Sequence, residues 1–300
     1  MAIFYLFDFR SLWSPFYATA LIAVLCFYFL ITVKYRSRFK DSEPLSKTQA
    51  LCFCIVIGLF YIIKGSPIDL WSHMMLTMHM IQMAVLVLII PVLIIKGIPD
   101  WVWRVLVYNK FIRPFWSFVT KPLIALVLFN GAFSLYHVPL VLDFSKTNSF
   151  YHASIHLLLF VLAICMFWPI LNTLKEYKKM PNLLEIGYLF ANGVLMLPAC
   201  ALIIFATDPM YSTYSDPESL INALALCATS ESVSGLDAIG PEIIEIFNPL
   251  ELINDQKLGG IIMKIVQEIV YAIILGFLFR DWYRSEQKLG RESDLNAQTY

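Results

Sequence analysis

The sequence predicts an all-α polytopic membrane protein with seven transmembrane helices, and three observations lead to this prediction. Of the 300 residues, 59% are apolar and only 15% are charged, whereas soluble domains carry about 25% charged residues. The mean hydropathy of +0.70 is too high for a disordered chain or a water-soluble globule. Seven separate runs approach the ~20 apolar residues that cross a bilayer as a helix, and the alternating pattern of a membrane β-barrel is absent from the sequence.

The seven runs form a single transmembrane domain over residues 1–300. The second run is the shortest, and it lengthens if residues 65–70 are counted with it. The predicted spans are 13–33, 49–64, 72–95, 122–142, 150–171, 183–206 and 260–279.

Two connections between the spans are long. Residues 97–121 contain three tryptophans among aliphatic side chains and predict an amphipathic helix at the membrane interface. Residues 207–259 are acidic and contain four prolines, which indicates an outer loop of turns with one short helix near 220–228. A removable signal peptide is not expected.

The basic residues predict the orientation. Seventeen of the 22 lysines and arginines fall in alternate connections and in the tail after the last span. By the positive-inside rule those connections are cytoplasmic. We therefore expect an N-terminus outside, a C-terminus in the cytoplasm and a location in the bacterial cytoplasmic membrane, with the lipid bilayer as the surrounding partner.

Several functional classes are disfavoured. The 22 basic and 22 acidic residues cancel, so no nucleic-acid partner is indicated. The six cysteines are too scattered for a disulfide scaffold, although Cys227 stands alone in the outer loop. Because no nucleotide-binding loop and no serine–histidine elbow is present, we do not expect an enzyme, and no catalytic residue is assigned.

All five histidines fall on the predicted outer side. His73 and His79 lie in the first part of the third span, and His137 lies near the end of the fourth. His152 and His156 open the fifth span four residues apart, so their imidazoles share one helical face. A single interfacial histidine usually bonds only water or headgroups. For His137, whose proline-broken helix end exposes carbonyls, metal binding and a structural role are equally favoured.

Methionines surround the first two histidines. Met74 and Met78 belong to a group of five methionines within ten residues. Thioether and imidazole ligands together favour copper, especially Cu(I), over hard cations, although methionine-rich helices more often simply pack. The candidate metal ligands are His73, His79, His137, His152, His156, Met74 and Met78.

Two acidic residues are candidates for supporting roles. Asp255 lies at the level of the histidines and is expected to orient a ligand. Glu268 lies inside the last span, four residues after Lys264. An intramembrane carboxylate is costly unless it is paired, so Glu268 is interpreted either as half of a structural ion pair or as part of a proton relay.

Motifs along nearly the whole chain resemble the bacterial CtaG family, the assembly factor of caa3-type cytochrome c oxidase. The most specific motif is the run Asp255-Gln256-Lys257-Leu258-Gly259-Gly260. The other matching motifs are Trp13-Ser14-Pro15, His73-Met74-Met75, His79-Met80-Ile81-Gln82-Met83, Tyr136-His137-Val138-Pro139, His152 with His156, and Asp208-Pro209-Met210-Tyr211. The stretch 218–250 is longer than the family pattern.

The resemblance implies a seven-span protein that matures the copper centre of a haem–copper oxidase. Carried over, the histidine motifs fall on His73, His79, His137, His152 and His156, and the loop acid falls on Asp255. The implied partner is an oxidase subunit in the same membrane, while an extracytoplasmic copper donor and a homodimer stay open.

Three hypotheses for function remain. The first is a metallochaperone for respiratory-chain biogenesis, which binds copper at the outer leaflet and delivers it to the oxidase. The second is a haem-binding or electron-transfer protein with two histidines on iron. The third is a scaffold or proton-coupled transporter without metal, in which Glu268 carries the proton.

Overall fold

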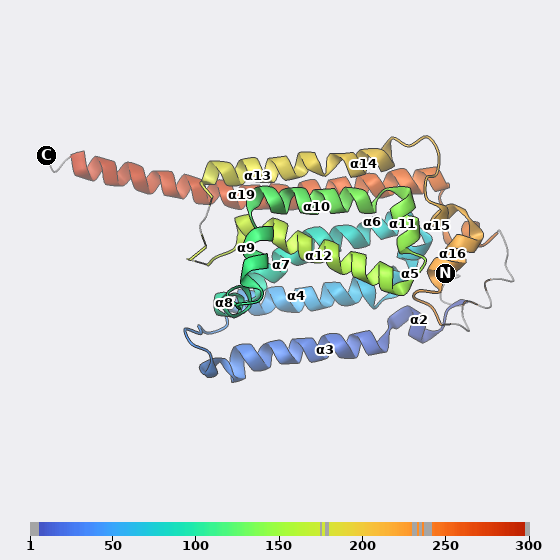
Figure 1. The fold of residues 1–300 in the computed structure, drawn as a ribbon, viewed down its shortest axis with the longest axis horizontal. Helices are drawn as coiled ribbons and strands as arrows, with labels where there is room; N and C mark the ends of the chain where they lie inside the picture. Colours follow the sequence, from blue (N-terminus) through green and yellow to red (C-terminus); the bar gives the residue numbers. More distant parts are fainter. Residues whose placement is uncertain are drawn as a thin grey trace.

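The computed structural model describes residues 6–174, 176–177, 180–229, 233, 236 and 242–297, with side chains as far as residue 287. Among these residues every regular element is a helix, so the predicted all-α class is confirmed. Figure 1 shows the long helices running side by side in one bundle. Helix α2 lies at one end of the bundle, and the C-terminal part of α19 projects beyond the other end.

The transmembrane helices agree with the number predicted. Six helices are long and apolar enough to cross a membrane, and a seventh span results when the bent pair α9 and α10 is counted as one, with an angle of 79° between them. The six are Phe9–Lys34, Lys47–Lys64, Leu76–Gly97, Ser149–Leu171, Asn182–Ile204 and Ile243–Gln287.

The individual elements have the following bounds. They are α2 Phe9–Trp13, α3 Pro15–Phe29, α4 Lys47–Lys64, α5 Pro67–Met74, α6 Leu76–Ala84, α7 Ile90–Gly97, α8 Asp100–Val107, α9 Arg113–Val119, α10 Pro122–Tyr136, α11 Pro139–Ser145, α12 Ser149–Leu171, α13 Asn182–Leu195, α14 Leu197–Ile204, α15 Ser212–Ser215, α16 Pro217–Leu224, α18 Ile243–Phe247 and α19 Leu252–Ala297.

Two of the predicted spans are each broken into two helices, and both breaks lie at the same end of the bundle. The span 72–95 is interrupted at Met75, whose extended backbone separates α5 from α6. The span 122–142 ends at Tyr136, and α11 starts afresh at Pro139. The second break has a local cause, because a proline disfavours helical backbone in the residue before it. The first has no proline or glycine and depends on a distant carboxylate described below.

The predicted outer connection 207–259 is partly helical. It contains α15, α16 and α18, and α19 already begins at Leu252, so the last span is the middle of a 46-residue helix. The short helix predicted near 220–228 is present as α16. Residues 230–232, 234–235 and 237–241 of this loop, and three of the basic residues used for orientation, 175, 178 and 179, lie outside the described residues.

Buried aromatic side chains hold the opposite end of the bundle together. The indole of Trp168 on α12 meets Trp103 of α8 and Trp116 of α9 at centroid distances of 4.8 and 5.1 Å. The predicted interfacial helix is therefore two short helices, and Trp103 turns into the protein rather than toward headgroups, with 7% exposure. The outward faces are apolar, as a bilayer requires: Phe16 and Phe27 on α3 are largely exposed.

Candidate metal centre

The five imidazoles come from α5, α6, α12 and the end of α10, and their rings lie close together. The end of the bundle that carries α5 and α11 (Figure 1) is hereafter called the histidine end. Ring centroids are 5.1 Å apart for His73 and His152, 4.1 Å for His152 and His156, 6.1 Å for His156 and His79, and 6.3 Å for His79 and His137. Each ring is at least nine-tenths buried. Four separate helices thus bring the histidines into one continuous row, which we call the imidazole series.

The middle of the imidazole series is built on α12. The side chain of Asn148 caps this helix by accepting a hydrogen bond from the backbone N–H of Phe150. His152 and His156 follow in the next turns, four residues apart, and their rings are the nearest neighbours in the series. The shared face expected from their spacing is therefore present.

His137 caps the C-terminal end of α10. Its Nδ1 lies 2.8 Å from the carbonyl oxygen of Phe133, one turn earlier. Because a carbonyl can only accept, this contact assigns the proton to Nδ1 and leaves Nε2 with a free lone pair. The Tyr-His-Val-Pro motif therefore exposes a carbonyl that fixes the ring, as its proline suggested.

Tyr136 joins two members of the imidazole series and was missed in the sequence. Its hydroxyl lies 3.1 Å from Nε2 of His156 and 3.4 Å from Nε2 of His79. A hydroxyl carries one proton, so it donates to one nitrogen and accepts from the other. The sequence could have indicated Tyr136 as part of the site, since it directly precedes His137 at the end of the same helix.

Five imidazole nitrogens of the series are buried without a hydrogen-bond partner. Leaving one such atom unpaired costs about 1–3 kcal/mol, so buried polar groups are normally satisfied. Each neutral imidazole keeps one N–H, so only some of these nitrogens offer a lone pair, but a group of neighbouring unpaired ring nitrogens is typical of a site that binds a ligand. The atoms are His79 Nδ1, His137 Nε2, His152 Nδ1, His152 Nε2 and His156 Nδ1.

Asp255 acts on the imidazole series indirectly, through backbone amides of α6. Its carboxylate, at the start of α19, accepts hydrogen bonds from the N–H groups of Leu76 and Thr77, at 2.7 and 3.2 Å. These two amides open α6, so a carboxylate 178 residues away in sequence caps this helix. His79 follows one turn later, and Asp255 positions its helix without contacting an imidazole in the described structure.

The remaining candidates have different surroundings. Met74 packs in a second apolar cluster with Leu70 and Leu220, and Met78 is half-buried. Glu268 forms an ion pair with Lys264 at 2.6 Å, but 63% of its side chain is exposed. This pair lines a lateral cavity of about 510 Å³ between α13 and α19.

A buried lysine also borders the histidine end. Lys146 is 2% exposed, and its ammonium donates to the carbonyl of Ser72 at 3.0 Å and to the hydroxyl of Tyr214 at 2.7 Å. Burial lowers the pKa of Lys146 to about 7. The sequence could have singled out Lys146, because it is one of few basic residues on the predicted outer side.

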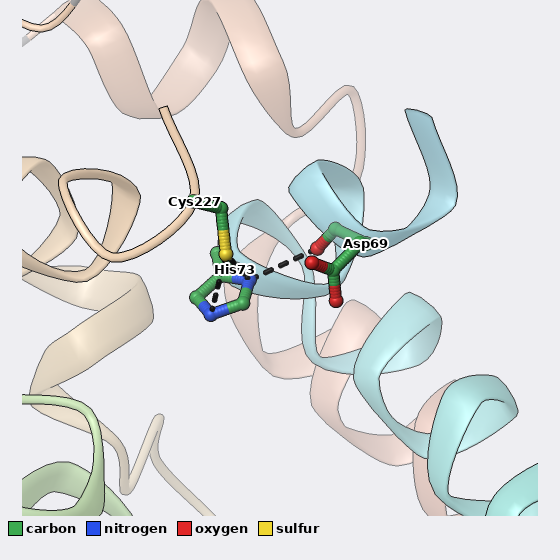
Figure 2. Close-up of side chains that lie close together, drawn as sticks. All are labelled: Asp69, His73 and Cys227. Carbon is green, nitrogen blue, oxygen red and sulfur yellow. Dashed lines mark hydrogen bonds between the residues drawn. The ribbon is translucent and has the colours of Figure 1, made fainter. Parts of the chain in front are cut away.

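A separate group of ligand atoms lies where the series begins. Asp69, His73 and Cys227 each offer one atom, and these atoms lie within 4.8 Å of one another (Figure 2). Sequence reasoning missed Asp69 and treated Cys227 as isolated, because α5 and the segment after α16 meet only in the folded chain. Burial raises the pKa of the Cys227 thiol, so without an ion it is protonated.

Comparison with known proteins gives one result. The family model described as cytochrome c oxidase caa3 assembly factor matches residues 26–285. No curated protein and no solved structure matches the chain. The match covers all the helices that carry the imidazole series and agrees with the resemblance of the sequence motifs. The chain therefore belongs to the caa3 cytochrome c oxidase assembly factor family, and it is a multi-pass protein of the bacterial cytoplasmic membrane.

Proposed function

We propose that this assembly factor holds copper in the imidazole series and delivers it to the catalytic subunit of the oxidase. The observation that supports this most is the row of five buried imidazoles, in which five nitrogens lack a hydrogen-bond partner. The oxidase is the partner implied by the family, and copper is the metal that its assembly requires. Copper is thus cargo here rather than a resident cofactor.

The donor set favours copper over hard cations. Neutral imidazole nitrogens suit first-row transition metals, whereas magnesium and calcium need oxygen ligands. Asp255, the nearby buried carboxylate, is engaged by backbone amides of α6. The proposed first ligands are therefore His79, His152 and His156, with His137 Nε2 as a further lone-pair donor.

The spacing of the series suits transfer. Each ring lies within 4.1–6.3 Å, centroid to centroid, of the next. A bound ion can then gain one nitrogen before it loses another, so it is never stripped of ligands. We place the histidine end outside, because the basic connections of the sequence lie at the other end. Copper would then come from an extracytoplasmic donor.

One observation favours a different role. The Lys264–Glu268 pair lines an open lateral cavity of about 510 Å³ in the middle of an apolar surface. A largely exposed carboxylate inside a bilayer is costly unless another group covers it. A scaffold that docks a partner helix without holding metal would use this cavity, and Glu268→Gln would then impair oxidase assembly more than loss of any histidine.

Copper binding by the purified protein distinguishes these roles. We expect His79→Ala and His156→Ala each to lower the Cu(I) retained against a competing chelator, and to lower oxidase assembly in cells. Cys26→Ala, on the exposed face of α3, is the matched control and should retain copper. Unchanged copper in both histidine variants would rule out the series as the site, and a Soret band would indicate haem instead.

A further inference from the structure

Three potential metal ligands other than the proposed first ligands His79, His152 and His156 converge at the histidine end. Asp69 and His73 lie four residues apart on α5, and Cys227 follows α16 (Figure 2). The ligand atoms of all three lie within 4.8 Å of one another. His73 is fully buried, while Asp69 and Cys227 are partly exposed. The group therefore lies between the surface and the other four rings of the imidazole series.

Packing holds Cys227 against α5. Leu220 and Leu224 on α16 are buried in one apolar cluster with Leu70 and Met74 on α5. The backbone N–H of Cys227 donates to the carbonyl of Leu224 and continues the turn that ends α16. Because these helices pack through their buried faces, the thiol is brought to His73 across 154 residues of sequence.

The distances suit coordination. Cys227 Sγ lies 3.5 Å from His73 Nε2 and 3.6 Å from Nδ1. A tetrahedral ion bound at about 2.3 Å to sulfur and about 2.0 Å to nitrogen separates those ligands by about 3.5 Å. His73 Nδ1 faces the backbone carbonyl of Asp69 at 2.9 Å, which assigns its proton to Nδ1 and leaves Nε2 for an ion.

The charges favour a monovalent ion. Lys64 is 3.0 Å from Asp69 Oδ1, and the amide of Gln82 donates to the same oxygen at 2.7 Å. The lysine thus already balances the carboxylate. Above the lowered pKa of Lys146 that lysine is neutral, and a Cys227 thiolate then leaves one net negative charge, which a monovalent ion cancels. Thiolate is a soft ligand and imidazole also binds copper, and Cu(I) combines softness with a single charge.

We propose that Asp69, His73 and Cys227 form a distinct Cu(I) site, the thiol site, from which the ion reaches the imidazole series. On binding, the Cys227 thiol loses its proton to solvent as the copper–sulfur bond forms, with no change of oxidation state. The next ring, His152, is 5.1 Å from that of His73 and has no partner at either nitrogen. The transfer step rests on the proposed function, whereas the site itself does not.

Thiol alkylation of the full-length protein in detergent tests the site. Cu(I), supplied as its acetonitrile complex, is expected to protect Cys227 from N-ethylmaleimide, as read by peptide mass spectrometry. Cys26 is the internal control and should react equally with and without copper. In Asp69→Asn the copper concentration for half-protection should rise about ten- to a hundredfold. Equal alkylation of wild-type Cys227 with and without Cu(I) would overturn the proposal.

Two further arms separate this proposal from the proposed function. In the double variant His79→Ala/His156→Ala, protection of Cys227 should persist, since the thiol site does not use those rings. Loss of protection there would mean that copper in the series shields the thiol indirectly, and would overturn the thiol site. Protection by Zn²⁺ at lower concentrations than Cu(I) would overturn the assignment to a monovalent ion.

Discussion

Tyr136 shows how much of the site depends on single atoms. Its hydroxyl lies between His79 and His156, two of the proposed ligands, which belong to different helices. The spacing of His152 and His156 predicted their shared face, because helical geometry alone determines it. No spacing rule could predict that the hydroxyl of Tyr136 reaches His79, since that contact joins two helices 57 residues apart in sequence.

Replacing Tyr136 by phenylalanine is expected to strengthen copper binding. Without the hydroxyl, Nε2 of His79 and His156 lose a competing hydrogen-bond partner, and copper affinity should rise by up to about tenfold, equivalent to ~1.4 kcal/mol. The metal-free protein should lose about 1–2 kcal/mol of stability, because two buried nitrogens become unpaired. Chelator competition and thermal unfolding measure the two effects. A variant that binds no copper would mean that the tyrosine itself holds the ion.

Lys146 makes stability depend on pH. Its pKa in the folded protein is lowered from 10.5 to about 7 by burial. Between these values the unfolded chain binds a proton that the folded chain lacks, so the free energy of unfolding rises with pH across this window. The gain is on the order of 5 kcal/mol at most.

In Lys146→Met the rise in melting temperature from pH 7 to 9 should be smaller than in the wild type, whereas in the exposed-site control Lys40→Met it should be unchanged. Identical pH profiles for wild type and Lys146→Met would contradict this account.

At the scale of elements, hydropathy predicted which segments form long apolar helices but not where those helices break. An apolar run in a bilayer must form a helix, so the spans follow from composition. No proline or glycine lies in residues 68–90 around the break at Met75, and it is the remote carboxylate of Asp255 that caps the new helix there. Pro139 indicated the break after Tyr136, but the predicted span 122–142 continued beyond this proline.

The close contact between α6 and α19 requires a glycine at position 259, which has no side chain. A Cβ at Gly259 would lie 3.1 Å from Met80 Cγ and 3.2 Å from the backbone oxygen of Leu76. Gly259→Ala should therefore push α6 away, lower stability by about 1–3 kcal/mol and weaken copper binding through His79. Gly58→Ala on α4 is the matched control, because its Cβ would meet no atom within 4 Å. Thermal unfolding and copper titration give the comparison, and equal behaviour of the two variants would contradict it.

At the scale of the whole molecule, the two ends of the bundle differ in chemistry. One end contains the imidazole series, the thiol site and Lys146, and the other is closed by packed tryptophans. The sequence placed all five histidines at one end because alternate spans run in opposite directions. It could not show that the rings form a row, since the order His73, His152, His156, His79, His137 interleaves four helices.

Copper K-edge X-ray absorption of the Cys227→Ser protein tests the central claim most directly. This variant lacks the thiolate of the proposed thiol site, so retained Cu(I) reports on the imidazole series. The expected spectrum shows nitrogen neighbours at about 2.0 Å with the outer-shell scattering of at least two imidazole rings. Failure to retain copper, or a spectrum without imidazole scattering, would contradict copper binding by the buried histidines.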